Sequence, residues 1–258
     1  MKTLSVIIIT KNEEENLEDC INSLGGIAHE IVVVDYLSSD ATPEIAKRLG
    51  AKFHATSSWH GFGTQKNIAL SLASMDWVLS LDADERLTPE LCTEISNLLV
   101  SEHERTAFEL SRLSSFCGEF IHHSGWSPDY VLRLFKRGTA KFSPDLVHER
   151  VITQGKVGRL NNKLIHHSYK DYEQVIHKLN HYTSASAAQM LQKGQTSNIF
   201  KAIGHGGWAF VRSYLLRGGF LDGSKGFALA FYCAEVSYYK QLKLALLSDA
   251  AQATRACD

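Results

Sequence analysis

The sequence predicts an α/β domain built on a mostly parallel, Rossmann-like sheet, followed by a helical carboxyl-terminal region. The first observation is that short β-branched runs alternate with helical patterns along residues 1–105, in the order that a parallel sheet requires. The second is that long helical patterns dominate from Tyr172 onward. With 258 residues, the chain is long enough to bury a substantial core.

Four buried strands are expected in the first part of the chain, at residues 4–9, 30–34, 51–55 and 77–81. Helices are expected over residues 16–24, 42–50 and 64–74, and a fourth begins at Thr88. Thr42 and Thr88 each precede a proline, which indicates a capping hydroxyl followed by proline at the first helical position. The resulting βαβαβαβ order is typical of a nucleotide-binding half-domain.

The pattern changes near residue 107, where short strands are expected at residues 107–112 and 130–135. We therefore expect residues 1–105 to form the nucleotide-binding half and residues 106–170 to form the acceptor-binding half of the same domain. Residues 171–258 are expected to form a helical region, with breaks at Gly204-Gly206-Gly207 and at Gly218-Gly219.

Composition excludes several classes of protein. The 27 basic and 28 acidic residues nearly cancel, which argues against a dedicated nucleic-acid binder. The five cysteines form no C-x-x-C pair, which argues against a zinc site or a disulfide framework and favours a reducing cytosol. The amino terminus has too short an apolar run for a signal peptide, so we expect a first buried strand there.

The strongest chemical signal is a pair of aspartates, Asp82 and Asp84, directly after the strand at residues 77–81. Ligands bind at the carboxyl ends of strands in open parallel sheets. Hard carboxylate oxygens suit Mg²⁺ or Mn²⁺, which can bridge to a diphosphate and offset the charge on a leaving group. The alternative is that these residues only cap the helix that begins at Thr88.

Two more polar clusters follow strands of the same sheet. Asp35 ends the strand at residues 30–34 and can accept hydrogen bonds from a nucleobase imide or a ribose hydroxyl. Asp40, five residues on, is better explained as a helix cap. Thr10, Asn12 and Glu13 follow the first strand, where the alternative for Glu13 is to complement a helix amino terminus.

Three stretches, in this order and at this spacing, resemble family 2 glycosyltransferases of the GT-A fold, the fold of nucleotide-diphospho-sugar transferases. They are residues 5–13, 33–40 and 81–85. The resemblance implies a uridine site lined by Thr10, Glu13 and Asp35, and Asn12 is expected among the residues that bind the nucleotide sugar. It further implies that Asp82 lies near the ribose and that Asp84 ligates Mn²⁺ or Mg²⁺.

Residues 61–67 also look like a family segment, and this likeness implies that Lys66 meets the diphosphate. A cation near a helix start is chemically suitable there. One departure is Tyr36, which stands where relatives usually carry a small residue. We expect its phenol to crowd the base pocket.

The predicted general base rests on a narrower resemblance, to lipopolysaccharide core β-glucosyltransferases of the WaaE/KdtX type. In these proteins a Val-His-Glu tripeptide follows an Arg-Leu-Phe strand, as residues 147–149 follow residues 133–135 here. We expect Glu149 to be the base of an inverting transfer, with Asp145 as the second candidate. The alternative for Glu149 is a surface pair with Arg150 or His148. No histidine is assigned to a metal, because their spacing matches no zinc signature.

The sequence thus predicts an inverting, metal-dependent glycosyltransferase that moves a hexose, glucose in the first instance, from a UDP-sugar. By resemblance, the acceptor is a lipid-linked glycan, the heptose of a lipopolysaccharide inner core, at the cytoplasmic face of a bacterial inner membrane. One alternative is a sugar nucleotidyltransferase, and another is an inactive nucleotide-binding scaffold. A nicotinamide dehydrogenase is excluded because the first turn lacks G-x-G-x-x-G.

The apolar run at residues 227–234 is too short to span a bilayer. Two roles stay open for the helical region. It could lie in a membrane interface as an amphipathic element and make a peripheral membrane contact, or it could form a core-packing or dimerising helix pair and give a homo-oligomer. The family resemblance favours the membrane.

Overall fold

The computed structural model describes residues 2–143 and 149–257, and the side chains of its last helix as far as Ala250. The chain divides into two compact units. The first unit holds Met1–Leu113 and Asp129–His166, and the second holds Ser114–Pro128 and His167–Asp258. These units differ from a simple division at residues 105 and 170, because the second unit takes in a segment from the middle of the chain. The functional roles expected for each half remain predictions.

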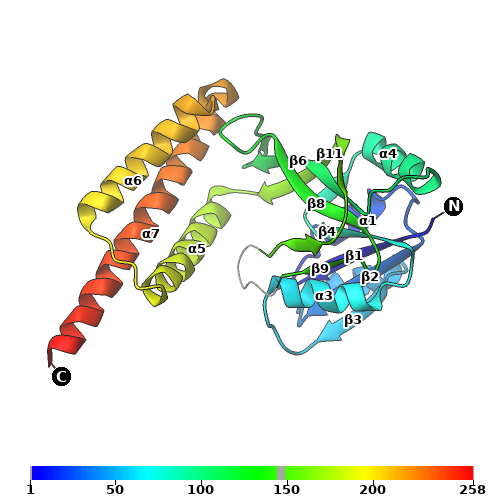
Figure 1. The fold of residues 1–258 in the computed structure, drawn as a ribbon, viewed down its shortest axis with the longest axis horizontal. Helices are drawn as coiled ribbons and strands as arrows, with labels where there is room; N and C mark the ends of the chain where they lie inside the picture. The colour runs from blue at the N-terminus through cyan, green and yellow to red at the C-terminus, as the bar shows by residue number, and fades with distance from the viewer. Residues whose placement is uncertain (1, 144–148, 258) are drawn as a thin grey trace. The chain divides into compact units, whose positions relative to one another are not determined.

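The first unit is built on a sheet whose described strands follow the order β3-β2-β1-β4-β8-β6-β11-β5 (Figure 1). The strands are β1 Leu4–Thr10, β2 Glu30–Tyr36, β3 Lys52–Thr56, β4 Trp77–Asp82, β5 Glu85–Leu87, β6 Ala107–Phe116, β8 Asp129–Lys136 and β11 Val157–Tyr169. The first four strands pair in parallel, whereas β8 runs antiparallel to β4 and β6. The predicted fold class is confirmed.

Four helices accompany this sheet: α1 Leu17–Asn22, α2 Thr42–Arg48, α3 Phe62–Leu72 and α4 Pro89–Val100. The apolar side chains of β1 and β4 are almost completely buried, as expected for central strands covered on both faces. The expectation of a buried strand at residues 51–55 was wrong, because β3 lies at the edge of the sheet and its residues are exposed or half-buried. A separate two-stranded ribbon pairs β9 Ala140–Phe142 with β10 Val151–Thr153. The hydrophobic core therefore lies along the central strands. The carboxyl ends of these strands are available for a functional site.

The two predicted helix caps have different outcomes. Thr88 caps α4, because its hydroxyl accepts a hydrogen bond from the Leu91 amide at 3.2 Å. The prediction for Thr42 was wrong: its hydroxyl accepts from the Glu13 amide at 2.8 Å, and Asp40 accepts from the Thr42 amide at 3.0 Å. Asp40 thus accepts a hydrogen bond from the first residue of α2, in keeping with the role at the helix start expected for it. Thr42 joins α2 to the loop after β1.

The second unit consists mainly of helices: α5 Tyr172–Gln192, α6 Ile199–Val211, a π-helical turn η1 Arg212–Leu216, a 3-10 turn η2 Gly219–Asp222 and the long α7 Gly223–Cys257, with the short strand β7 Glu119–Phe120. Helix α7 packs along both α5 and α6 (Figure 1). A small core centres on Phe116, Tyr169 and Leu229. The predicted helical carboxyl-terminal region is confirmed.

One predicted helix break was wrong and one is confirmed. Helix α6 continues through Gly204, Gly206 and Gly207. A Cβ atom at Gly206 would lie 3.1 Å from the side chain of Tyr238, so this glycine allows close packing of α6 on α7. At Gly218 the backbone is left-handed, with φ of 67°, and the helix ends there as predicted. Among the described residues, no helix combines the length and the apolar character needed to cross a bilayer.

Candidate functional site

The predicted site residues gather at the carboxyl ends of neighbouring parallel strands. In the strand register, Thr10 of β1 lies opposite Asp35 of β2, and Ile9 of β1 lies opposite Asp82 of β4. Each of these strands ends at or near its polar residue. The fold therefore brings the three predicted stretches to one edge of the sheet.

Asp35 is buried and organises the loops at this edge. Its carboxylate accepts hydrogen bonds from the Thr10 hydroxyl at 2.8 Å, from the Ser38 amide at 2.9 Å and from the Ser38 hydroxyl. Asn12 has a related role, because its side-chain oxygen accepts from the Ser39 amide at 2.8 Å. Both side chains hold the loops after β1 and β2 together.

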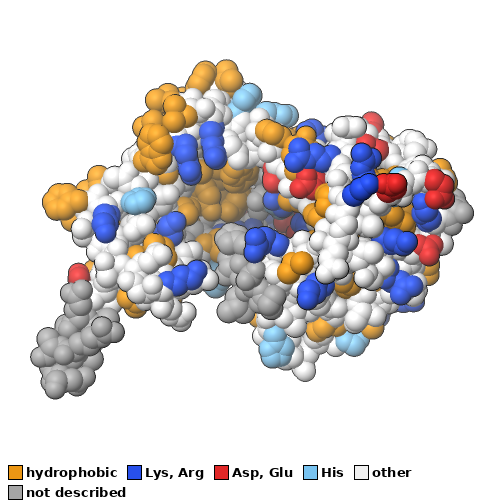
Figure 2. Space-filling view, in the orientation of Figure 1, with side chains coloured by type: hydrophobic (Ala, Val, Ile, Leu, Met, Phe, Trp, Pro, Cys, Tyr) orange, Lys and Arg blue, Asp and Glu red, His pale blue; other side chains and the backbone are white. Residues whose placement is uncertain are grey.

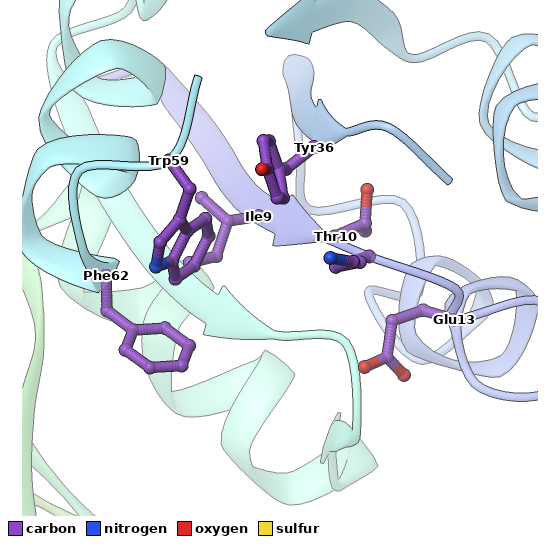
Figure 3. A pocket seen from close by; sticks show the side chains of 7 residues that line it. Ile9, Thr10, Glu13, Tyr36, Trp59 and Phe62 are labelled. Carbon is purple, nitrogen blue, oxygen red and sulfur yellow. The ribbon is translucent and has the colours of Figure 1, made fainter. Parts of the chain in front are cut away.

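Beside Asp35 lies a pocket of about 500 Å³ (Figure 3), within the size range of small-molecule sites. Its lining residues are Ile9, Thr10, Lys11, Glu13, Tyr36, Trp59 and Phe62. The rings of Tyr36 and Trp59 lie 5.4 Å apart, and those of Trp59 and Phe62 lie 4.9 Å apart. Tyr36 thus forms part of an aromatic wall and leaves the cavity open.

Lys66, on α3, joins two of the predicted site residues. Its ammonium nitrogen lies 2.8 Å from Asp82 Oδ1 and 2.7 Å from Glu149 Oε1. The lysine side chain is only 4% exposed, so its charge depends on these carboxylates rather than on water. Asp82 and Glu149, the predicted base, are therefore linked through one buried cation.

The contact between Lys66 and Glu149 depends on how α3 docks against the β9–β10 ribbon. The Asn67 side chain exchanges two hydrogen bonds of 2.9 Å with the backbone of Phe142. A Cβ atom at Gly63 would lie only 1.9 Å from the Ser143 carbonyl oxygen, so this approach requires glycine. Ser143 in turn pairs with the backbone of Arg150, which places the neighbouring Glu149 beside the helix.

A second buried cation, Arg133 of β8, lies between Asp82 and Glu85. Its guanidinium donates to both carboxylates, at 2.7 Å to Glu85. Arg112 adds a contact of 3.6 Å to Glu85 and pairs with Asp129 at 2.8 Å. Burial opposes ionisation of Asp82, but the charges of Arg133 and Lys66 outweigh it and hold its pKa well below the ordinary range. Asp82 is thus a permanently charged part of the site.

Asp84 occupies a different environment. Its Oδ2 atom lies 3.4 Å from His166 Nε2, and the two side chains are 26% and 15% exposed. The contact follows from the register, since His166 of β11 lies opposite Glu85 of β5, next to Asp84. In the described part of the chain, no cluster of three or more His, Cys, Asp or Glu side chains is arranged to hold a metal ion. Asp84 and His166 offer two donor atoms.

The structure thus brings Lys66, Asp82 and Glu149 together, and it pairs Thr10 with Asp35. Asp145, the second base candidate, lies outside the described residues. The site residues that sequence reasoning missed are Glu85, Arg112, Arg133, His166, Trp59 and Phe62. Glu85 directly follows the aspartate pair, and this adjacency was the one local signal available; the other contacts depend on strand pairing and on the loop before α3.

Comparison with known proteins places this architecture in a family. The sequence model of glycosyl transferase family 2 matches residues 5–145. An uncharacterized glycosyltransferase of Rickettsia typhi is 32% identical, over 96% of this chain and 88% of the relative. The lipopolysaccharide core biosynthesis glycosyltransferase LpsC of Rhizobium meliloti is 31% identical, over 92% of each chain.

Two solved structures show weaker similarity. Staphylococcus aureus TarS in complex with UDP-GlcNAc is 17% identical, with a TM-score of 0.49, over 66% of this chain and 59% of TarS. Glucosyl-3-phosphoglycerate synthase from Mycobacterium tuberculosis, crystallised with Mn²⁺ and UDP, is 24% identical, with a TM-score of 0.36, over 44% of each chain. On the family match and the full-length relatives, the chain belongs to glycosyl transferase family 2.

Proposed function

We propose that this glycosyltransferase moves a hexose, glucose in the first instance, from a UDP-sugar to a glycan acceptor with inversion at the anomeric carbon. The observation that carries the proposal is the bridge that Lys66 makes between Asp82 and Glu149. It sets a donor-side aspartate and a carboxylate able to take a proton on either side of one cation. Adjacent groups can therefore contact the donor diphosphate and the acceptor hydroxyl.

The aromatic pocket is the proposed uridine site. A uracil ring can stack on the wall formed by Tyr36, Trp59 and Phe62. Thr10 and Glu13 supply polar groups at the same cavity, and buried Asp35 keeps the surrounding loops in place. On this proposal Tyr36 is a binding surface for the base, in contrast to the crowding expected from the sequence.

Metal dependence is supported by the donor atoms of Asp84 and His166. A carboxylate and an imidazole together suit Mn²⁺, and carboxylate oxygen also suits Mg²⁺. These two residues would hold the ion, and phosphate oxygens of the donor would complete its ligands. When bound, the ion neutralises charge on the departing diphosphate.

The proposed reaction is a single displacement. The acceptor oxygen forms a bond to the anomeric carbon as the bond from that carbon to the diphosphate oxygen breaks, and UDP leaves with the bonding electrons. Glu149 takes the proton of the acceptor hydroxyl. Lys66 lies between Asp82 and Glu149 and adds positive charge near the donor. Asp145 stays the second candidate for the base.

The acceptor is proposed from the relative in Rhizobium meliloti that is named for lipopolysaccharide core biosynthesis. We propose a lipid-linked glycan, the heptose of an inner core, reached at the cytoplasmic face of the inner membrane through a peripheral contact. Family membership favours sugar transfer over nucleotidyl transfer. An inactive nucleotide-binding scaffold is distinguished by the experiment that follows.

The test is isothermal titration of UDP, UDP-glucose, GDP and dTDP, each with and without Mn²⁺, together with release of UDP in the presence of acceptor. We expect UDP compounds to bind best and to need the metal. In Asp84→Ala the metal dependence should disappear and turnover should fall on the order of a hundredfold or more, because a main electrostatic stabiliser is removed.

The matched control is Asp19→Ala, an exposed acidic residue on α1, which should keep both properties. Turnover of Asp84→Ala within a few-fold of wild type would show that Asp84 is not the metal ligand. Binding of UDP without any transfer or donor hydrolysis would support the scaffold, and release of pyrophosphate from UTP and a sugar phosphate would support a nucleotidyltransferase.

A further inference from the structure

Helix α6 of the second unit has two unlike faces. Its buried stripe contains Ala202, Gly206 and Ala209, and Gly206 packs against α7. The stripe opposite includes Phe200 and Ile203, which are 81% and 57% exposed. Since residues three and four apart share one side of a helix, Phe200 and Ile203 lie on one side of α6, and the described side chains of the second unit leave both largely exposed.

The exposed apolar surface continues past the end of α6. Leu215 and Leu216 of η1 are 55% and 65% exposed, and Leu221 of η2 is 61% exposed. Figure 2 shows hydrophobic side chains gathered where α6 ends and α7 begins, with lysine and arginine side chains among them. We call this surface the apolar face and define it by Phe200, Ile203, Trp208, Leu215, Leu216 and Leu221.

Ring contacts join the helices and turns that carry the apolar face. Phe210 of α6 lies 5.7 Å from Phe227 and 5.9 Å from Phe231 of α7, measured between ring centroids. Tyr214 of η1 likewise lies 6.3 Å from Phe220 of η2. The helices and turns that carry the exposed side chains are thus held to one another.

The exposed charged side chains of α6, η1 and η2 all have one sign. The sequence contains no aspartate or glutamate between Glu173 and Asp222. The Asp222 carboxylate is only 4% exposed and lies 2.9 Å from His123 Nδ1. Lys201 of α6 and Arg212 at the start of η1, by contrast, are exposed, and the helical period places both on the same side as Trp208. Cations next to exposed aliphatic and aromatic side chains match an anionic lipid surface, in which the apolar groups enter and the charges meet headgroups.

We propose that the apolar face binds an anionic lipid surface, with α6 lying along the plane of the headgroups. A second copy of the chain fits less well, because a symmetric contact would set the same cations against each other. The reason for such binding rests on the proposed function, since a lipid-linked acceptor is presented at a membrane. The binding itself is independent of the transfer chemistry.

The test is sedimentation of the full chain with vesicles of phosphatidylglycerol and phosphatidylcholine, or of phosphatidylcholine alone. We expect at least about tenfold tighter binding to the anionic vesicles, weakening as salt is added. Leu215→Glu combined with Leu216→Glu should lower the affinity at least about tenfold. Lys201→Gln combined with Arg212→Gln should remove the preference for anionic lipid.

The matched control is Ile176→Glu on α5, because Ile176 is 65% exposed, as Leu216 is; its vesicle binding should equal that of wild type. UDP titration of each variant confirms that it is folded and separates this test from that of the proposed function. Failure of wild type to bind anionic vesicles would overturn the inference. An equal loss in Ile176→Glu would also overturn it, as would a dimer that Leu215→Glu with Leu216→Glu dissociates without any vesicle binding by wild type.

Discussion

The two units treat charged and apolar side chains in opposite ways. The first unit buries Lys66, Glu85 and Arg133 against groups of opposite charge. The second unit leaves Phe200 and Leu216 largely exposed. Buried charge is costly unless it is paired, and exposed apolar surface contributes nothing to folding. Each of our two proposals rests on one of these features: binding of a charged small molecule on the paired buried charges of the first unit, and binding of a lipid surface on the exposed apolar side chains of the second.

The largest expected effect tests the buried charge of the first unit. Arg133→Met should lower the free energy of unfolding by about 3 to 5 kcal/mol, because it leaves the fully buried Glu85 carboxylate without its main partner. Equilibrium urea denaturation measures the change. The control in the second unit is Arg212→Met, an exposed position, where a change within about 0.5 kcal/mol is expected. Equal effects at the two arginines would remove the contrast between the units.

A smaller effect, on the activation free energy of sugar transfer, is expected at Glu149, the second carboxylate that Lys66 contacts. Glu149→Gln should lower turnover about a hundredfold or more, because the amide cannot take the acceptor proton, while UDP affinity stays within a few-fold. UDP release at saturating donor measures this. Glu104→Gln, at a carboxylate that is 81% exposed, should leave turnover unchanged. Full activity in Glu149→Gln would show that another residue is the base, and Asp145 would be the next candidate.

The smallest effect concerns Glu30, a buried carboxylate at the opposite end of β2. Burial raises its pKa, but hydrogen bonds from Lys52, Ser5 and Ser74 outweigh burial and lower the pKa to about 2. Because the folded pKa lies below the ordinary value of 4.5, this stabilisation is present above about pH 4.5 and is lost as the pH falls toward 2.

Unfolding free energies of wild type and Glu30→Gln across that range should therefore converge by on the order of 2 kcal/mol. The exposed Glu90→Gln should keep the wild-type dependence on pH. A constant difference between wild type and Glu30→Gln would show that the ionised form of Glu30 does not stabilise the fold.

The sequence was informative where a signal is local. Buried runs of β-branched residues predicted the central strands, and the polar residues that end them predicted the positions of Asp35, Asp82 and Asp84. Thr88 and Gly218 were predicted because caps and left-handed turns depend on a few adjacent residues. The contact of Thr10 with Asp35 follows from the parallel pairing of β1 with β2.

The missed features depend on distant pairings. Arg133 reaches Asp82 across 51 positions of sequence, and His166 reaches Asp84 only through the pairing of β11 with β5. Arg133 lies in the Arg-Leu-Phe stretch noted in the sequence, but its contact with Asp82 could be seen only from the pairing of β8 with β4. The helix break expected at Gly206 was wrong for a similar reason, since that glycine is required by the packing of α6 on α7.

The bridge made by Lys66 has a consequence for the order in which ligands bind. Three cations, Lys66, Arg112 and Arg133, face four carboxylates, those of Asp82, Glu85, Asp129 and Glu149. A bare nucleoside diphosphate would add negative charge to a place that already carries an excess of it. Charge balance thus favours a donor that arrives already complexed with its divalent cation, and nucleotide affinity should follow the concentration of that complex rather than that of total nucleotide.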